Sequence, residues 1–332
     1  MKKVLIVTWN ADHPGTEGVA AAIRRRGAQV IRLNTDDFPS IVKLSYYQDD
    51  QGERVYLDDA EGRHDLSDLT AIWYRRMRPA LRLDKEELGA DVHYACVEEA
   101  RQHLIGLVEG RDIFVVDSPH VLRRNEVKAR QARLARLVGL DVPRSLYTNN
   151  PEEARAFVAS CPHGAVTKMM TMFSVRRGAE VDVVFTNRVK PEDLEHLDGL
   201  AQSPMIFQEL VPKARELRVA VVGDKLFTIG INSAATARGQ VDWRRSSGNP
   251  DSVWAADSLP PEIAAKLLRL GDMLGQNYGG VDFIITPEGR YVFLEWNPAG
   301  EYGWVLEHHA GPMEEAYADL LLGEVRPRKM YP

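Results

Sequence analysis

The sequence lacks any apolar run that approaches the roughly 20 residues needed to cross a membrane. Its first apolar run, Val4 to Val7, is too short for the core of a signal peptide. Cysteine is also scarce, because Cys96 and Cys161 are the only two and show no metal-ligand spacing. These absences predict a cytoplasmic protein with no membrane partner, whose two thiols stay reduced and serve as packing residues.

The chain has no surplus of basic residues either. Its formal net charge is -6, which argues against a nucleic-acid partner, since general nucleic-acid binders carry a positive excess. Apolar content, in contrast, is ample: 44% of the 332 residues are hydrophobic. A chain of this length and composition is expected to bury substantial cores in two or three domains.

Two common phosphate-binding motifs are missing. The loop after the first apolar run, Trp9 to Gly15, contains no G-x-G-x-x-G, so nothing there indicates a dinucleotide site. No G-x-x-x-x-G-K-[ST] occurs anywhere in the chain. Any nucleotide phosphates must therefore be held by individual lysines.

The first third of the chain alternates strands with helices. Apolar runs at Lys3–Thr8 and Val30–Leu33 flank a helical segment at Glu17–Arg26, an order typical of a doubly wound parallel sheet. Further elements are expected as strands at Val42–Tyr47, Ala71–Tyr74 and Ile113–Val116 and as a helix at Asp91–Val108. These elements predict an N-terminal α/β domain of residues 1–117.

A change of pattern at Asp117-Ser118-Pro119 begins the second part of the chain. Asn125 is expected to cap a helix that runs to Val138. We divide the remainder into a central subdomain, residues 118–203, and a C-terminal subdomain, residues 204–332, with α+β character. The expected strands are Ala165–Met169, Asp182–Thr186, Met205–Glu209, Arg218–Val222 and Lys225–Ile231, and the expected helices are Pro191–Leu197 and Pro261–Leu274.

A hairpin near the C-terminus carries polar side chains among apolar neighbours. Its strands, Gly279–Thr286 and Tyr291–Asn297, are joined by a four-residue turn. This loop length pairs the two residues that flank the turn and, counting back, pairs Asp282 with Glu295. Side chains alternate along a strand, so Glu295 and Asn297 share a face. The opposite face is expected to hold Val292, Leu294 and Trp296.

This hairpin predicts a metal site. Asp282 and Glu295, facing each other inside apolar strands, repel and lose hydration unless a positive group lies between them. Together with Asn297 they form an all-oxygen set, which fits Mg²⁺ that retains waters and substrate phosphates. The alternative is a solvent-facing strand that carries a few charges.

Two lysines are candidates for the phosphates. Lys168 lies inside an apolar strand, where a buried cation is costly unless an anion meets it. Lys128 lies in the first turn of its helix, the end that the macrodipole makes unfavourable for cations. Each lysine alone also fits a surface residue whose stem packs on apolar neighbours. The stretch Met205–Pro212 ends extended and can offer backbone groups to an adenine edge.

The order and spacing of these residues resemble the ATP-grasp superfamily. The matching residues are Lys128, Lys168, Gln208, Glu209, Leu210, Val211, Glu216, Arg218, Arg244, Asp282, Glu295 and Asn297. The resemblance implies an ATP-grasp fold behind the N-terminal domain, with ATP and Mg²⁺ as cofactors. It also implies that the two lysines contact the ATP phosphates, that the Gln-Glu-Leu-Val stretch meets the adenine, and that Glu216 contacts the nucleotide.

Two arginines are implied to be catalytic. By motif position, Arg218 and Arg244 would neutralise the phosphates and the acyl-phosphate transition state, where preorganised cations help most. Arg218 also fits the exposed face of an edge strand, and Arg245 competes with Arg244 for its place.

Two N-terminal stretches are similar to those of graspetide synthetases, the microviridin-type ATP-grasp enzymes that cyclise ribosomal precursor peptides. They are Leu33–Pro39 and Ile72–Arg76, and both fall at carboxyl ends of expected strands. Arg75 and Arg76 can receive acidic side chains of a substrate by bidentate contact, although a solvated arginine pair is the alternative. In this sequence Met77 follows the pair, where the family pattern has proline.

The resemblance implies the partner and the reaction. The partner is a precursor peptide with leader and core, and a homodimer is expected from the family. Asp or Glu side chains of the core are activated as acyl phosphates and then cross-linked to Ser, Thr or Lys. The alternatives are a ligase that adds amino acids to a protein C-terminus or a small acid, and a nucleotide-binding regulator without catalysis.

Overall fold

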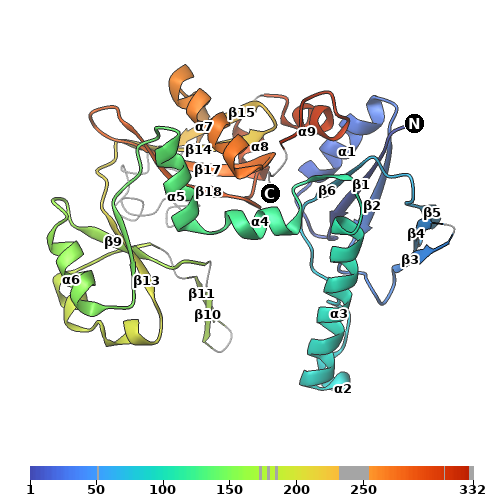
Figure 1. Cartoon of the computed structure of the whole chain (residues 1–332), viewed down its shortest axis with the longest axis horizontal. Helices are drawn as coiled ribbons and strands as arrows, with labels where there is room; N and C mark the ends of the chain where they lie inside the picture. Colours follow the sequence, from blue (N-terminus) through green and yellow to red (C-terminus); the bar gives the residue numbers. More distant parts are fainter. Residues whose placement is uncertain are drawn as a thin grey trace.

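The computed structural model describes residues 1–50, 52–171, 174–177, 180–183, 186–231, 254–309 and 311–328. Figure 1 places the N-terminal unit and the central sheet on opposite sides of the molecule, with the C-terminal sheet between them along the top. Both cysteines are free, as predicted, with Cys161 buried and Cys96 half-buried. No helix within the described ranges is long and apolar enough to span a bilayer.

The N-terminal unit is built on a parallel sheet, as predicted. Its order is β2-β1-β6-β7, with β1 at the centre beside β2 and β6. The strands are β1 (Lys3–Thr8), β2 (Gln29–Asn34), β6 (Ala71–Tyr74) and β7 (Phe114–Val116), and the helices are α1 (Gly15–Arg25), α2 (Lys85–Leu88) and α3 (Ala90–Glu109). Alternate β1 side chains pack on α1 and on α3, so both faces of the sheet are covered.

A second, antiparallel sheet in this unit was not predicted. It consists of β3 (Lys43–Asp49), β4 (Gly52–Asp59) and β5 (Gly62–Asp65). The strand expected at Val42–Tyr47 is present as β3, but it pairs with β4 and not with the parallel sheet. Gly52 and Gly62 lie at φ +93 and +122, a conformation that glycine supplies at the two tight turns.

The predicted start of the helix from Asn125 to Val138 is wrong. The structure has two helices here, α4 (Pro119–Asn125) and α5 (Lys128–Leu137), and Asn125 ends the first instead of capping the second. Its buried amide nitrogen donates to the Leu274 carbonyl and to Gln276 Oε1. Asn125 therefore ties α4 to the C-terminal subdomain, a use that local sequence cannot reveal.

Asp117 joins the N-terminal sheet to the C-terminal one. Its fully buried carboxylate accepts hydrogen bonds from the backbone and side-chain nitrogens of Asn277 and from the Tyr278 backbone, at 2.8 to 3.0 Å. Burial raises the pKa of Asp117 to about 6, against the effect of these donors. This contact fixes the end of β7 beside the start of β17 (Tyr278–Ile285).

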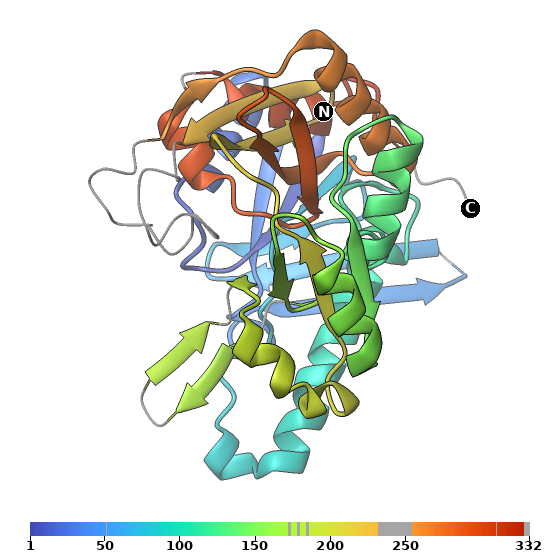
Figure 2. The ribbon, with the colours of Figure 1, turned by 90° about the vertical axis from the view of Figure 1, so that its left-hand side faces the viewer.

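The central sheet has the order β12-β9-β13-β8 and lies against α6 (Pro151–Ala159). Its strands are β8 (Ser145–Thr148), β9 (Ala165–Lys168), β12 (Asn187–Arg188) and β13 (Met205–Glu209). The 3-10 helices η1 (Pro191–Glu195) and η2 (Asp198–Ala201) precede β13. The separate hairpin of β10 (Ser174–Arg177) and β11 (Glu180–Val183) projects from the body beside this sheet in Figure 2.

The C-terminal sheet is antiparallel throughout, in the order β16-β15-β14-β17-β18. Its strands are β14 (Arg215–Val222), β15 (Lys225–Ile231), β16 (Ala255–Asp257), β17 (Tyr278–Ile285) and β18 (Tyr291–Asn297). One face packs on α5 and α7 (Pro261–Leu274), while α8 (Gly303–His308) and α9 (Met313–Leu321) lie on the other. These layers confirm the predicted α/β class with an α+β C-terminal part.

Candidate active site

A cavity of about 530 Å³ lies between the central and the C-terminal sheet. It is lined by β9 and β13 from one sheet and by β14, β17 and β18 from the other. The predicted site residues on its wall are Lys128, Lys168, Gln208, Glu209, Leu210, Val211, Glu216, Arg218, Asp282, Glu295, Asn297 and Arg76. Arg244 lies outside the described residues. Residues far apart in sequence thus meet around one space.

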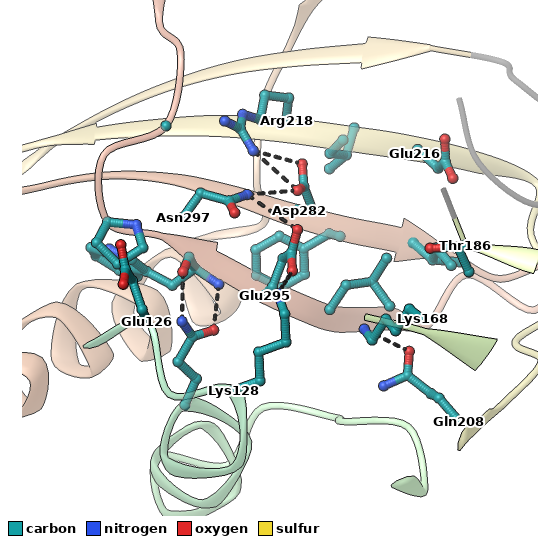
Figure 3. Close-up of a pocket in the computed structure, with 18 of the residues that line it drawn as sticks. Glu126, Lys128, Lys168, Thr186, Gln208, Glu216, Arg218, Asp282, Glu295 and Asn297 are labelled. Carbon is teal, nitrogen blue, oxygen red and sulfur yellow. Dashed lines mark hydrogen bonds and ion pairs between the residues drawn. The ribbon is translucent and has the colours of Figure 1, made fainter. Parts of the chain in front are cut away.

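Three polar side chains of the hairpin converge at this cavity. Asp282 pairs with Glu295 across the two strands. The amide nitrogen of Asn297 lies 3.1 Å from Asp282 Oδ2 and 3.3 Å from Glu295 Oε1, so the amide bridges both carboxylates (Figure 3). The predicted convergence of the three groups is confirmed.

The register that brings Asp282 opposite Glu295 was predicted for the wrong reason. Tyr291 pairs with Ile285 and not with Thr286, so the count from the turn is off by one residue. A bulge between Asp282 and Phe283 adds one residue to β18 and restores the expected pair. Because of the bulge, two side chains of β18 also lie on a different face of the sheet from the one predicted.

Val292 pairs with Ile284, and directly opposed side chains share a face of the sheet. Ile284 lies two residues after Asp282 and so shares its face, while Leu294 is the extra residue of the bulge and lines the cavity beside Glu295. The predicted placement of Val292 and Leu294 opposite the polar set is therefore wrong. Trp296 does belong to the opposite, core face, where it packs with Phe283 and Phe293.

Two cations hold the carboxylates in this structure. Arg218 Nη1 lies 3.0 Å from both Asp282 oxygens, and Lys128 Nζ forms an ion pair with Glu295 (Figure 3). Arg218 is only 5% exposed, which excludes the alternative of an exposed edge-strand residue. A Cβ on Gly280 would stand 2.2 Å from Arg218 Nη2, so glycine at this position makes room for the guanidinium.

The other end of the cavity is lined by hydrogen-bonded polar side chains. Lys168 Nζ donates to Gln208 Oε1 at 3.1 Å, and Gln208 Nε2 donates to Ser145 Oγ at 2.9 Å. Lys213 Nζ lies 2.7 Å from Glu216 Oε1, with both side chains buried. Sequence reasoning missed Lys213, although a lysine three residues before a site glutamate was a usable signal.

Two backbone N–H groups at the end of β13 already donate hydrogen bonds within the protein. The Leu210 N–H donates to the Gly164 carbonyl at 2.9 Å, and the Glu209 N–H donates to the Arg144 carbonyl at 3.0 Å. Any backbone donor to an adenine edge must therefore come from other groups of the Gln208–Val211 stretch or beyond.

Of the two predicted substrate-binding arginines, Arg75 is buried and Arg76 lies on the cavity wall. Arg75 is 4% exposed, lies 3.6 Å from Asp12 and stacks 4.8 Å from the Tyr302 ring. Burial opposes its charge, but Tyr278 and Asp12 raise the pKa of Arg75 above its ordinary value. Arg76 lines the cavity, and both guanidiniums bind Glu301.

Comparison with known proteins is consistent with this geometry. Residues 3–123 match the family model described as the MvdD pre-ATP grasp domain. The structure is similar to a RiPP-associated ATP-grasp ligase from Chryseobacterium gregarium, solved with ADP and a leader and core peptide. Identity is 35%, 99% of each chain is covered, and the TM-score is 0.93. The chain belongs to the family of RiPP-associated ATP-grasp ligases, which mature ribosomal peptides.

Two further proteins are similar to this ATP-grasp ligase. The macrocyclase MdnC from Microcystis aeruginosa, bound with its precursor peptide MdnA, is 35% identical over 97% of this chain and 100% of that one, with a TM-score of 0.87. A probable alpha-L-glutamate ligase from Teredinibacter turnerae is 23% identical over 73% of this chain and 78% of its own length.

The polar set of this ATP-grasp ligase fits a hard divalent cation. Two carboxylates and one amide supply oxygen donors at one face of the hairpin, which is the chemistry that Mg²⁺ prefers. No cluster of three His, Cys, Asp or Glu side chains with metal-binding geometry occurs within the described ranges. Three oxygen donors suit an ion that takes its remaining ligands from water and phosphates. Asn297 would have to turn its amide oxygen toward the ion.

Proposed function

We propose that this ATP-grasp ligase activates Asp or Glu side chains of a ribosomal precursor peptide and cross-links them within the peptide to Ser, Thr or Lys. The observation that carries the proposal is the single cavity that joins the carboxylate set to Arg218, Lys128 and Lys168. The full-length likeness to enzymes solved with precursor peptides supports a peptide substrate. ATP and Mg²⁺ are the proposed cofactors.

The proposed roles follow from position in the cavity. Lys128 and Lys168 bind the ATP phosphates, and Gln208–Val211 with Glu216 bind the rest of the nucleotide. Asp282, Glu295 and Asn297 hold Mg²⁺, which supplies charge neutralisation at the phosphates when it is bound. Arg218 stabilises the charge that develops on the transferred phosphoryl group. Arg244 keeps the same role by motif position alone.

The reaction has two steps. A carboxylate oxygen of the peptide attacks the γ-phosphorus of ATP, the bond to the β-γ bridging oxygen breaks, and ADP leaves, which gives an acyl phosphate. A hydroxyl oxygen or amine nitrogen of the same peptide then attacks the acyl carbon, and phosphate and the nucleophile's proton leave. Holding both peptide groups in one site makes the second step effectively unimolecular.

The direct test uses any small acidic peptide that contains Ser, Thr or Lys and is encoded beside this protein. With ATP and Mg²⁺ we expect the peptide to lose the mass of one water for each cross-link, measured by mass spectrometry, and ADP to appear in equal amount. Reactions without ATP, or with the core Asp and Glu residues of the peptide changed to Asn and Gln, should leave its mass unchanged.

A second function is favoured by the glutamate-ligase relative. It is the addition of free amino acids to a carboxyl group, which uses the same nucleotide site. Gain of an amino-acid mass in the same experiment would replace the cyclase proposal with this one.

A homodimer is also part of the proposal. Exposed apolar side chains support it: Val92 and Tyr94, which are 52% and 69% exposed, lie near the start of α3, the end of the helix that projects from the body (Figure 1). We expect Tyr94→Glu to convert a dimer to a monomer in light-scattering measurements, because a charge in an apolar interface is costly. Glu98→Gln on the same helix serves as the control. A dimer that persists in Tyr94→Glu would place the interface elsewhere.

A further inference from the structure

The loop after β18 brings a carboxylate from this chain to the cavity. Glu301 and Arg76 both line the cavity wall. Arg75 Nη2 lies 2.8 Å from Glu301 Oε2, and Arg76 pairs with the other oxygen, Oε1. The carboxylate is thus bound at both oxygens by two guanidiniums, the arrangement expected for recognition of a substrate carboxylate.

This site adjoins the phosphoryl-transfer residues. Arg218 Nη2 lies 3.4 Å from the backbone carbonyl of Glu301, and its Nη1 binds Asp282. The cavity wall therefore runs without interruption from the metal set through Arg218 to Glu301 and Arg76. A peptide carboxylate bound by the arginine pair would lie on the same wall as the residues that handle the γ-phosphate.

The Glu301 side chain can leave without stranding a buried charge. Arg75 keeps a second anion in Asp12, which is 3% exposed and is held by the Thr8 hydroxyl and the His13 backbone N–H. The Glu301 side chain, in contrast, is 47% exposed and can turn into solvent. Asp12 therefore stays beside Arg75 when the Glu301 side chain turns away.

The backbone around Glu301 is fixed, so exchange needs only the side chain to move. Tyr278 Oη donates to the Gly300 carbonyl at 2.6 Å, and Gln276 Nε2 donates to the Pro298 carbonyl at 3.0 Å. Arg218 holds the Glu301 carbonyl itself. Removing the Glu301 carboxylate should therefore leave this loop in place.

We propose that Arg75 and Arg76 form the receptor for the side-chain carboxylate of the peptide, and that Glu301 is an internal occupant of this receptor which the peptide displaces. The inference rests on the proposed function, since it names the contact of the acidic substrate group. An internal competitor lowers the apparent affinity for the substrate by the fraction of time that the receptor is occupied. It also keeps the arginines from binding unrelated anions.

The test is a binding measurement that requires no turnover. N-acetyl-glutamate α-amide, which carries one side-chain carboxylate, is titrated by ligand-observed NMR into the full chain with ADP and Mg²⁺ present. We expect Glu301→Gln to tighten binding of this probe about fivefold or more. The neutral N-acetyl-glutamine α-amide should show no gain. Glu307→Gln, a nearby carboxylate that meets His13 and not the arginine pair, should match the unchanged chain.

Arg76→Gln in the Glu301→Gln background should remove the gain. Binding of the acidic probe that is equal to or weaker than that of the unchanged chain would overturn the inference. So would a loss of ADP affinity or a large fall in the melting temperature of Glu301→Gln, because these mark Glu301 as a structural brace. Failure of the proposed function would appear separately, as a peptide that loses no water.

Discussion

Replacing Glu295 with Gln is expected to abolish turnover, with a fall of about a hundredfold or more in the rate of peptide dehydration. The change keeps the size of the side chain but removes one of the two carboxylates of the hairpin, Asp282 and Glu295. Magnesium would then be held with one anionic ligand fewer, next to phosphates that need its charge. Peptide dehydration, followed by mass spectrometry across a range of Mg²⁺ concentrations, measures the effect.

Two controls give this result its meaning. Glu288→Gln changes the same residue type in the turn of the same hairpin, where the side chain is exposed and does not line the cavity. It should retain full activity. Glu295 also pairs with Lys128, so loss of activity alone does not separate the two roles. Partial recovery at high Mg²⁺ identifies a metal ligand, whereas a rate independent of Mg²⁺ would assign Glu295 to positioning Lys128.

Removing the guanidinium at Arg218 is the second change with a large expected effect. Arg218→Ala should lower kcat by about a hundredfold to a thousandfold, because a preorganised donor beside the transferred phosphoryl group is lost. ADP affinity should change much less, since the arginine acts mainly on charge that develops in the transition state. Single-turnover kinetics and ADP titration separate these two quantities.

A matched pair of variants tests the position of this arginine as well as its charge. Gly280→Ala leaves Arg218 in the chain, but its Cβ would stand 2.2 Å from Nη2 and must displace the guanidinium. We expect a loss of kcat in the same direction. Arg215→Ala, on the same strand, removes an arginine that pairs with Asp257 outside the cavity, and its kcat should be unchanged. Equal activity in all three variants would exclude Arg218 from catalysis.

Much of the site could be predicted because several of its residues are recognisable from the sequence of a single strand. Lys168, Asp282 and Glu295 are polar groups inside apolar strands, and such residues need a partner that the strand itself cannot supply. The strand bounds were also accessible, since β13 and β18 lie where the apolar runs predicted them. Local chemistry was enough to identify these candidates.

The bulge in the hairpin could not be predicted by counting residues from the turn. The turn alone predicted the wrong pair at Thr286, and one extra residue in β18 corrected the register before Asp282. Bulges depend on how two strands twist against the helices packed on them, which a residue count does not include. The polar set was therefore predicted, while Val292 and Leu294 were assigned to the wrong face.

The sequence by itself determined the parallel N-terminal sheet, the antiparallel hairpin and the identity of the polar groups around the cavity, because these depend on periodicity within short segments. Only the tertiary structure decided which of those groups meet. Arg75 and Glu301 are 226 residues apart, and Asn125 binds the end of α7 and not its own helix. Such contacts depend on how the sheets pack, and packing sums many weak interactions that no local pattern records.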